Sequence, residues 1–171
     1  MIIAIAGMTA SGKNTIGELI AKEFGYRVVC PTFKDIAKKE GISLMALQEK
    51  AAKDKNIDLK FDELLRQEVA KGNCVVTTWL GPWMAGADVK IAIVAPLKVR
   101  ATRLAKRDGM TLKEAEKHVK ERDEQNIKRY KSVYGIDITD YTGFDAVIDN
   151  SDKTPEQVNE IAMKIIETKS R

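Results

Sequence analysis

Residues 1–15 read MIIAIAGMTASGKNT and carry the strongest structural signal in this 171-residue chain. Ile2–Ala6 is a short, wholly apolar run, which is typical of a strand buried on both faces of a parallel sheet. Gly7 and Gly12 follow with the spacing G-x-x-x-x-G-K, and from Lys13 onward the apolar residues recur with a helical period. Glycines let the backbone curl so that successive N–H groups face inward, and the helix N-terminus adds partial positive charge. The stretch therefore predicts a phosphate-binding loop between a strand and a helix.

The end of this loop indicates which class of nucleotide-binding protein is present. Lys13 is expected to reach the outer phosphates of a bound nucleotide. Asn14 stands where most proteins with this loop have a Ser or Thr hydroxyl on Mg²⁺, and Thr15 follows one position later. We expect Asn14 and Thr15 to lie near the metal and the β-phosphate. The G-K-x-T pattern favours small-molecule kinases, and the absence of D-x-x-G and N-K-x-D signatures argues against a GTPase.

The rest of the chain alternates between strand and helix patterns. Further strands are expected at residues 26–30, 73–77, 89–95 and 144–148, and helices at 13–24, 97–107, 111–134 and from 155 onward. Two capping boxes, Thr111 with Glu114 and Thr154 with Gln157, mark helix starts. Between the second and third strands lie only helical patterns, at 33–40, 44–54 and 59–71. This order predicts an α/β fold: one domain, residues 1–171, with a five-stranded parallel sheet sandwiched by helices and a helical insert at about 31–71.

Composition excludes several classes of protein. Apolar residues make up 44% of the chain, which argues against wholesale disorder, and the longest apolar runs are too short to span a bilayer. No basic region precedes the first apolar run, so no secretory signal is expected. Cys30 and Cys74 cannot form a disulfide framework, and His118 alone cannot build a His-rich metal site. The 29 basic and 25 acidic residues give a net charge of +4, which suits an anionic partner but is weak evidence for one.

Arginines cluster on the two helices between the fourth and fifth strands. Arg103 and Arg107 are four residues apart and share a helical face, close to Arg100. Arg122 and Arg129 are seven apart on the next helix. Two such helices joined by a turn predict a lid at about residues 107–130 that clamps the phosphates being transferred. The alternative is a pair of solvated helices whose arginines only face acidic neighbours.

The segment 129–138, RYKSVYGIDI, resembles the corresponding segment of cytidylate kinases of the archaeal type. The resemblance extends to Glu121-Arg122-Asp123, to APLKVRA at 95–101 and to Trp83-Met84-Ala85, and it covers essentially the whole chain. It implies a P-loop kinase with a helical monophosphate-binding insert and an arginine lid. The implied reaction is transfer of the γ-phosphate of ATP to CMP or dCMP, with Mg²⁺, in the cytoplasm.

The residue patterns and the resemblance together predict roles for individual residues. Lys13, Arg122 and Arg129 would be catalytic. ATP would be bound by Gly7, Met8, Thr9, Ala10, Ser11, Gly12, Lys13, Asn14, Thr15, Arg103 and Arg107, and Mg²⁺ would lie near Asn14 and Thr15. The acceptor would be bound by Thr32, Lys34, Asp58, Asp62, Arg66 and Trp79.

The acceptor side departs from the family pattern in two places. The family commonly has G-D-I-F-R before the first insert helix, where this chain reads CPTFK at residues 30–34. Lys34 keeps the charge of the arginine but loses its bidentate fork. After the third strand the family has an acidic residue, a glycine and an arginine, whereas this chain reads TTWLGPW at residues 77–83, one residue shorter, and lacks the acid and the arginine.

Several assignments on the acceptor side stay open. Asp58, Asp62 and Arg66 lie four residues apart in turn, so they would either read an amino-pyrimidine edge or form a solvated stripe. Trp79 and Trp83 would either wall the acceptor base or belong to the core. The acceptor could be another small molecule, or the chain could be a nucleotide-binding, RNA-associated switch driven by ATP. The main hypothesis expects only small-molecule nucleotides as partners, with no membrane or nucleic acid, and a monomer.

Overall fold

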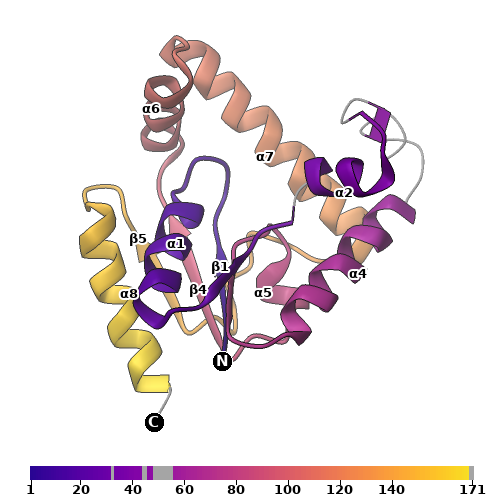
Figure 1. Ribbon diagram of the computed structural model, residues 1–171. Helices are drawn as coiled ribbons and strands as arrows, with labels where there is room; N and C mark the ends of the chain where they lie inside the picture. The colour runs from indigo at the N-terminus through magenta and orange to yellow at the C-terminus, as the bar shows by residue number, and fades with distance from the viewer. Residues whose placement is uncertain (32, 44–45, 48–55, 170–171) are drawn as a thin grey trace.

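The computed structural model describes residues 1–31, 33–43, 46–47 and 56–169, with all of their side chains except those of 33–35 and 56–59. Strands and helices alternate along the chain (Figure 1). In chain order the elements are β1 (Ile2–Ala6), α1 (Lys13–Phe24), β2 (Arg27–Val29), α2 (Phe33–Glu40), α4 (Asn56–Ala70), β3 (Cys74–Val76), α5 (Gly81–Met84), β4 (Val89–Val94), α6 (Leu97–Asp108), α7 (Leu112–Tyr134), β5 (Ala146–Asp149) and α8 (Pro155–Lys169).

The five strands form one sheet in the order β2-β3-β1-β4-β5, and every neighbouring pair is parallel. β1 lies at the centre, with Ile2 opposite Cys74 of β3 and Ile3 opposite Val89 of β4. A central parallel strand has both faces covered by helices, which explains why β1 is wholly apolar. The loop after β1 consequently lies at the middle of the sheet's carboxyl edge, where ligands bind in open α/β sheets.

Successive residues of the central strands point to opposite faces of the sheet and build two cores. Ile3 and Ile5 pack with buried residues of α1 and α8 on one face. Ala4 packs on the other face with Val76 and with Leu65 of α4. Figure 1 shows α1 and α8 side by side on one side of the sheet, with α4 and α5 on the other. Each fully buried isoleucine contributes about 1.5–3 kcal/mol, so both faces stabilise the sheet.

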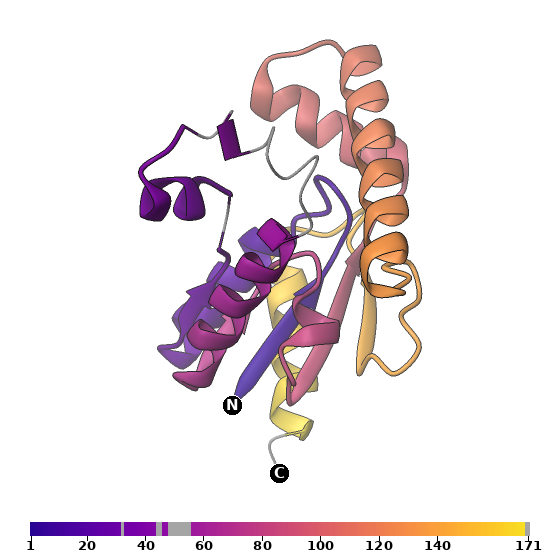
Figure 2. The same cartoon turned by 90° about the vertical axis from the view of Figure 1, so that its right-hand side faces the viewer.

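α6 and α7 form a hairpin that extends beyond the carboxyl edge of the sheet. Ala101 and Leu104 of α6 pack on Ala115 and Val119 of α7, and all four are buried. The Thr111 side chain accepts from the Glu114 N–H, and the Glu114 carboxylate accepts from the Thr111 N–H in return, so the predicted capping box is present. In Figure 2 the loop after β1 lies between this hairpin and the insert helices α2 and α4.

The expected α/β architecture is confirmed: five parallel strands, with helices on both faces of the sheet. α5 was not expected, because a four-residue helix is too short to show a period. α4 begins at Asn56 rather than at residue 59, and most of the helix expected at 44–54 lies outside the described residues. The bounds of the acceptor insert and of the lid remain predictions. Within the described segments, no helix is long and apolar enough to cross a membrane.

Candidate active site

The loop between β1 and α1 is tightly curled. The Ser11 N–H donates to the Met8 carbonyl at 3.1 Å, and the Ile16 N–H donates to the Gly12 carbonyl at 3.1 Å to begin α1. Gly12 has a φ of 94°, which suits a residue without Cβ, whereas Ala10 adopts the left-handed region at a φ of 58° despite its side chain. A left-handed alanine costs about 1 kcal/mol or more, so neighbouring groups must hold Ala10 in this conformation.

A cavity of about 310 Å³ opens above this loop. Its lining combines the loop with three arginines of the α6–α7 hairpin and one aromatic side chain located after β3. The described lining residues are Met8, Thr9, Ala10, Ser11, Gly12, Lys13, Asn14, Thr15, Trp79, Arg103, Leu104, Arg107 and Arg122. Positive charge, backbone amides and a helix N-terminus converge here, which makes the cavity suited to a polyphosphate.

Lys13 is half-buried in this cavity, and its Nζ lies 5.4 Å from the centre of the Trp79 ring. Burial lowers the pKa of Lys13 below its ordinary value of 10.5. Cys30 and Asp123 oppose this shift electrostatically, while the positive charge of Arg122 lowers the pKa further. In the free protein the negative charges near Lys13 therefore do not fully offset the burial of its ammonium group. A bound phosphate group would supply further negative charge.

The structure brings three of the four predicted lid arginines to the cavity. Arg103 and Arg107 reach it from α6, and the exposed Arg122 reaches it from α7. Arg107 also pairs with Asp108, with Nε 2.6 Å from a carboxylate oxygen. Arg129 is not among the described lining residues; it is half-buried two turns further along α7.

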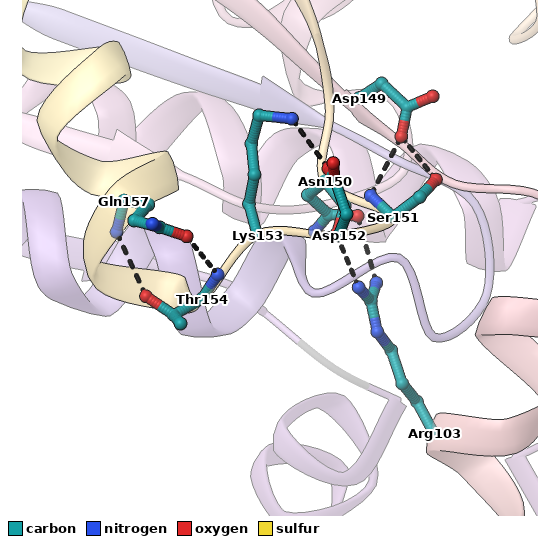
Figure 3. A network of polar contacts seen from close by, with 8 residues as sticks. All are labelled: Arg103, Asp149, Asn150, Ser151, Asp152, Lys153, Thr154 and Gln157. Carbon is teal, nitrogen blue, oxygen red and sulfur yellow. Dashed lines mark hydrogen bonds and ion pairs between the residues drawn. The ribbon is translucent and has the colours of Figure 1, made fainter.

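Arg103 also supports the loop from outside. Its guanidinium donates to Asn150 Oδ1 at 2.9 Å and to the Asn150 carbonyl at 2.7 Å, as Figure 3 shows, and to the Ser11 carbonyl at 3.4 Å. Asn150 is buried and donates its own Nδ2 to the Ser11 carbonyl at 2.8 Å. The end of β5 thereby connects α6 to the phosphate loop. In the same view Thr154 and Gln157 form the predicted capping box of α8.

A buried ion pair connects the hairpin to the loop at a second point. Arg100 Nη1 lies 2.6 Å from Asp123 Oδ2, and both side chains are about nine-tenths buried. The same Nη1 donates to the Thr9 carbonyl at 2.9 Å, while Asp123 Oδ1 accepts from the Thr9 N–H at 3.0 Å. Arg100 Nε donates to the Ala95 carbonyl at 3.0 Å. Charge-assisted hydrogen bonds of this kind are stronger than neutral ones.

On the acceptor side the structure describes only some of the predicted residues. Asp62 is buried and accepts a hydrogen bond from the Tyr134 hydroxyl at 2.8 Å, so it does not belong to a solvated stripe. Arg66 is exposed on α4. Thr32 lies outside the described residues, as do the side chains of Lys34 and Asp58.

The two tryptophans separate into different environments. Trp79 lines the cavity, and its ring lies 6.3 Å from that of Tyr130, which in turn lies 6.4 Å from Tyr134. Trp83 instead packs against Phe144 at 5.3 Å. An aromatic wall therefore runs from the phosphate loop along α7 to Asp62, and Trp79 is its first member.

Neutral oxygen atoms, rather than a cluster of acids, are available for a metal. The exposed side chains of Asn14 and Thr15 line the cavity. In the described part of the chain, no group of three or more His, Cys, Asp or Glu residues could hold a metal ion. Mg²⁺ often keeps several waters and binds through one or two protein groups plus substrate phosphates. The donors present fit an ion that arrives on a nucleotide better than a resident one.

Sequence reasoning missed the roles of Arg100, Asp123 and Asn150. Asp123 had a detectable signal, because it lies four residues from Val119 and eight from Ala115 and so shares their buried stripe. Arg100 stood with the other arginines of its helix and could not be distinguished from them by spacing. Asn150 comes directly after a strand and has no periodic signal.

Comparisons with known proteins show what the chain as a whole is similar to. The model of the cytidylate kinase-like family matches residues 2–152. A cytidylate kinase of Ignicoccus hospitalis is 36% identical over 169 residues, covering 96% of this chain and 98% of that protein. One from Pyrococcus horikoshii is 37% identical over 170 residues, covering 98% and 88%. Among solved structures, shikimate kinase of Aquifex aeolicus has a TM-score of 0.60 at 21% identity, covering 99% of this chain and 98% of that one, and it supports the fold alone.

Proposed function

Because the chain belongs to the cytidylate kinase-like family, we propose that it transfers the γ-phosphate of ATP to CMP or dCMP, giving ADP and CDP or dCDP. The observation that carries this proposal is the cavity in which the phosphate loop, Lys13, Arg103, Arg107 and Arg122 converge. Family membership favours the kinase over the RNA-associated switch. We further propose that the protein is a cytoplasmic monomer. Its partners would be small nucleotides, with no nucleic acid or membrane among them.

The proposed mechanism rests on positioning and charge. The loop amides and Lys13 bind the phosphates of ATP, and Arg103 and Arg107 approach them from α6. Arg122 faces the phosphoryl group in transfer, where negative charge is spread over its oxygens, and Arg129 of the same helix is proposed as a second catalytic arginine that neutralises this charge. The attacking phosphate of the monophosphate is already ionised near neutral pH, so the reaction needs no side chain as a general base.

Mg²⁺ would enter bound to ATP, and Asn14 and Thr15 would lie near it. When bound, the ion neutralises charge on the phosphates. The position of both neutral side chains in the lining of the cavity supports this assignment, since the substrate itself brings most of the ligands.

Acceptor binding is proposed to involve the insert and the aromatic wall. Trp79 offers a ring face beside Lys13, and Asp62 offers a buried carboxylate held by Tyr134, which suits a base that carries an exocyclic amino group. Arg66, Asp58, Thr32 and Lys34 complete the proposed acceptor set. Lys34 in place of an arginine predicts a weaker hold on the acceptor phosphate, and therefore a higher KM.

The test is an assay of ADP release with each common nucleoside monophosphate in turn. Activity should be highest with CMP or dCMP, and release without an acceptor should be negligible. The Lys13→Ala variant should lose at least about 100-fold in kcat while keeping its circular dichroism spectrum, because one charge-assisted contact to the transition state is removed. Activity on AMP with none on CMP would contradict the acceptor. Slow ATP hydrolysis that responds to RNA rather than to an acceptor would favour the switch.

A further inference from the structure

We propose that Arg100 and Asp123, here called the Arg100–Asp123 pair, are positioning residues that hold the phosphate loop in its nucleotide-binding conformation. The inference rests on the proposed function only in taking the cavity above the loop to be the ATP site. It assigns a role to two buried groups that do not line that cavity. It also makes the base of the α6–α7 hairpin part of the phosphate-binding machinery.

The pair holds both hydrogen-bonding groups of one loop residue. Asp123 accepts from the Thr9 N–H and Arg100 donates to the Thr9 carbonyl, while the two side chains bond to each other. This closed ring of charge-assisted bonds fixes the peptide planes before and after Thr9. The Thr9 side-chain hydroxyl, by contrast, is buried without a hydrogen-bond partner, so the ring holds the backbone rather than the side chain.

The orientation of the next amide depends on peptide geometry. In a trans peptide the carbonyl and the N–H point in opposite directions. Because the Thr9 carbonyl is held on Arg100, the Ala10 N–H points away from Arg100, and Ala10 itself lines the cavity. Ala10 is also the residue in the unfavourable left-handed region, at a φ of 58°. The pair therefore stabilises a strained conformation that exposes an amide to a ligand.

A purely structural role explains the pair less well. The hairpin already has an apolar interface in Ala101, Leu104, Ala115 and Val119. Apolar side chains in place of a buried ion pair are often equally or more stable, so stability alone does not require charges here. The contacts made beyond the hairpin go to the backbone of Thr9 and to the Ala95 carbonyl.

The first test separates stability from positioning. The double variant Arg100→Met/Asp123→Leu removes both charges together, so neither is left buried without a partner. Loss of the bonds to Thr9 and Ala95 should lower its melting temperature but leave the variant folded at the assay temperature, while the Kd for Mg·ATP, measured by titration calorimetry, should rise at least tenfold. A Kd within twofold of wild type in the folded double variant would overturn the proposal. Glu121→Gln is the matched control, because Glu121 is exposed on the same helix and its carboxylate pairs with Lys117 at 3.8 Å.

The second test uses the strain at Ala10 and does not depend on the double variant folding. Asp123→Asn keeps the shape of the side chain but removes the charge that faces Arg100, and should raise the Kd for Mg·ATP about threefold or more. Adding Ala10→Gly should recover part of that loss, because glycine adopts the left-handed region without the penalty. A thermodynamic cycle with Ala10→Gly alone isolates the coupling; additive effects would contradict the proposal.

Neither test requires an acceptor. Loss of Mg·ATP binding in the variants would support the positioning role even if CMP proved to be the wrong substrate. Conversely, wild-type protein that binds Mg·ATP but fails to phosphorylate CMP would contradict the proposed function and leave the positioning role standing.

Discussion

At the scale of single residues, the pKa of Lys13 depends on two opposing effects, burial in the free protein and the negative charge of a bound phosphate. The free protein buries its ammonium enough to lower the pKa below 10.5, and the neighbouring Arg122 adds to the effect. A bound phosphate reverses the balance, because an opposite charge within a few ångströms favours the protonated form. The Trp79 ring covers Lys13 at 5.4 Å and gives the cation partial compensation in the meantime.

This balance predicts proton uptake on nucleotide binding. The lowered pKa means that free Lys13 loses its proton at a lower pH than an ordinary lysine, and bound phosphate raises the pKa again. At a pH between the pKa of Lys13 in the free protein and its pKa in the nucleotide complex, binding of ATP is accompanied by uptake of a proton. The affinity for ATP therefore falls as the pH rises from the first pKa to the second. Calorimetry in buffers of different ionisation enthalpy measures the uptake directly. Lys13→Arg, which stays charged, should remove it; uptake that persists in this variant would assign the proton to another group.

At the scale of elements, α7 contacts three parts of the molecule: α6 of the hairpin, the phosphate loop and α4 of the insert. The Thr111 capping box starts the helix and Gly135 ends it, so its 23 residues span about 35 Å. Near its middle, Asp123 lies beneath the phosphate loop and the adjacent Arg122 faces the cavity. Toward its end, Tyr134 donates to Asp62 of α4. One rigid helix therefore links the hairpin, the loop and the insert.

Arg122 should act in the chemical step rather than in binding. Because the charge it meets develops during transfer, Arg122→Ala should lower kcat by about 100-fold or more while changing the KM for the acceptor much less. Steady-state kinetics with CMP varied at saturating ATP separates the two constants. Lys120→Ala removes an exposed cation two residues away and should leave both unchanged. A kcat for Arg122→Ala within about twofold of wild type would mean that Arg122 is an idle surface residue.

At the scale of the whole molecule, the site gathers residues located just beyond the carboxyl ends of three parallel strands. The phosphate loop comes after β1, Thr77 and Trp79 come after β3, and Asn150 comes after β5. On the β3 side this edge packs closely against α1, since a methyl group at Gly17 would lie 2.3 Å from Thr77 Cγ2. A ligand bound at such an edge contacts elements that are far apart in the sequence and stabilises them together.

Mg·ATP should therefore stabilise the molecule unevenly. At a concentration 100-fold above its Kd, it should add about 2.7 kcal/mol to the free energy of unfolding and raise the melting temperature accordingly. Hydrogen exchange should slow most in the phosphate loop and in the α6–α7 hairpin, whose arginines would contact the phosphates. Amides of α8, which contributes no residue to the described lining of the cavity, are the internal reference. Equal protection of α8 and the hairpin would indicate general stabilisation rather than closure of a lid.

The sequence alone determined the parts of this protein that depend on local chemistry. The apolar run of β1, the G-x-x-x-x-G-K spacing and the capping boxes at Thr111 and Thr154 each specify a structure within a few neighbouring residues, and each is present. Only the tertiary structure decided the strand order, the hydrogen bond from Tyr134 to Asp62 and the hydrogen bond from the Thr9 N–H to Asp123. These partners are 72 and 114 residues apart, and Asn150 reaches Ser11 across 139. A carboxylate on a helix has the same local pattern whether it faces water or a buried arginine, so its role depends on which distant backbone the fold brings against it.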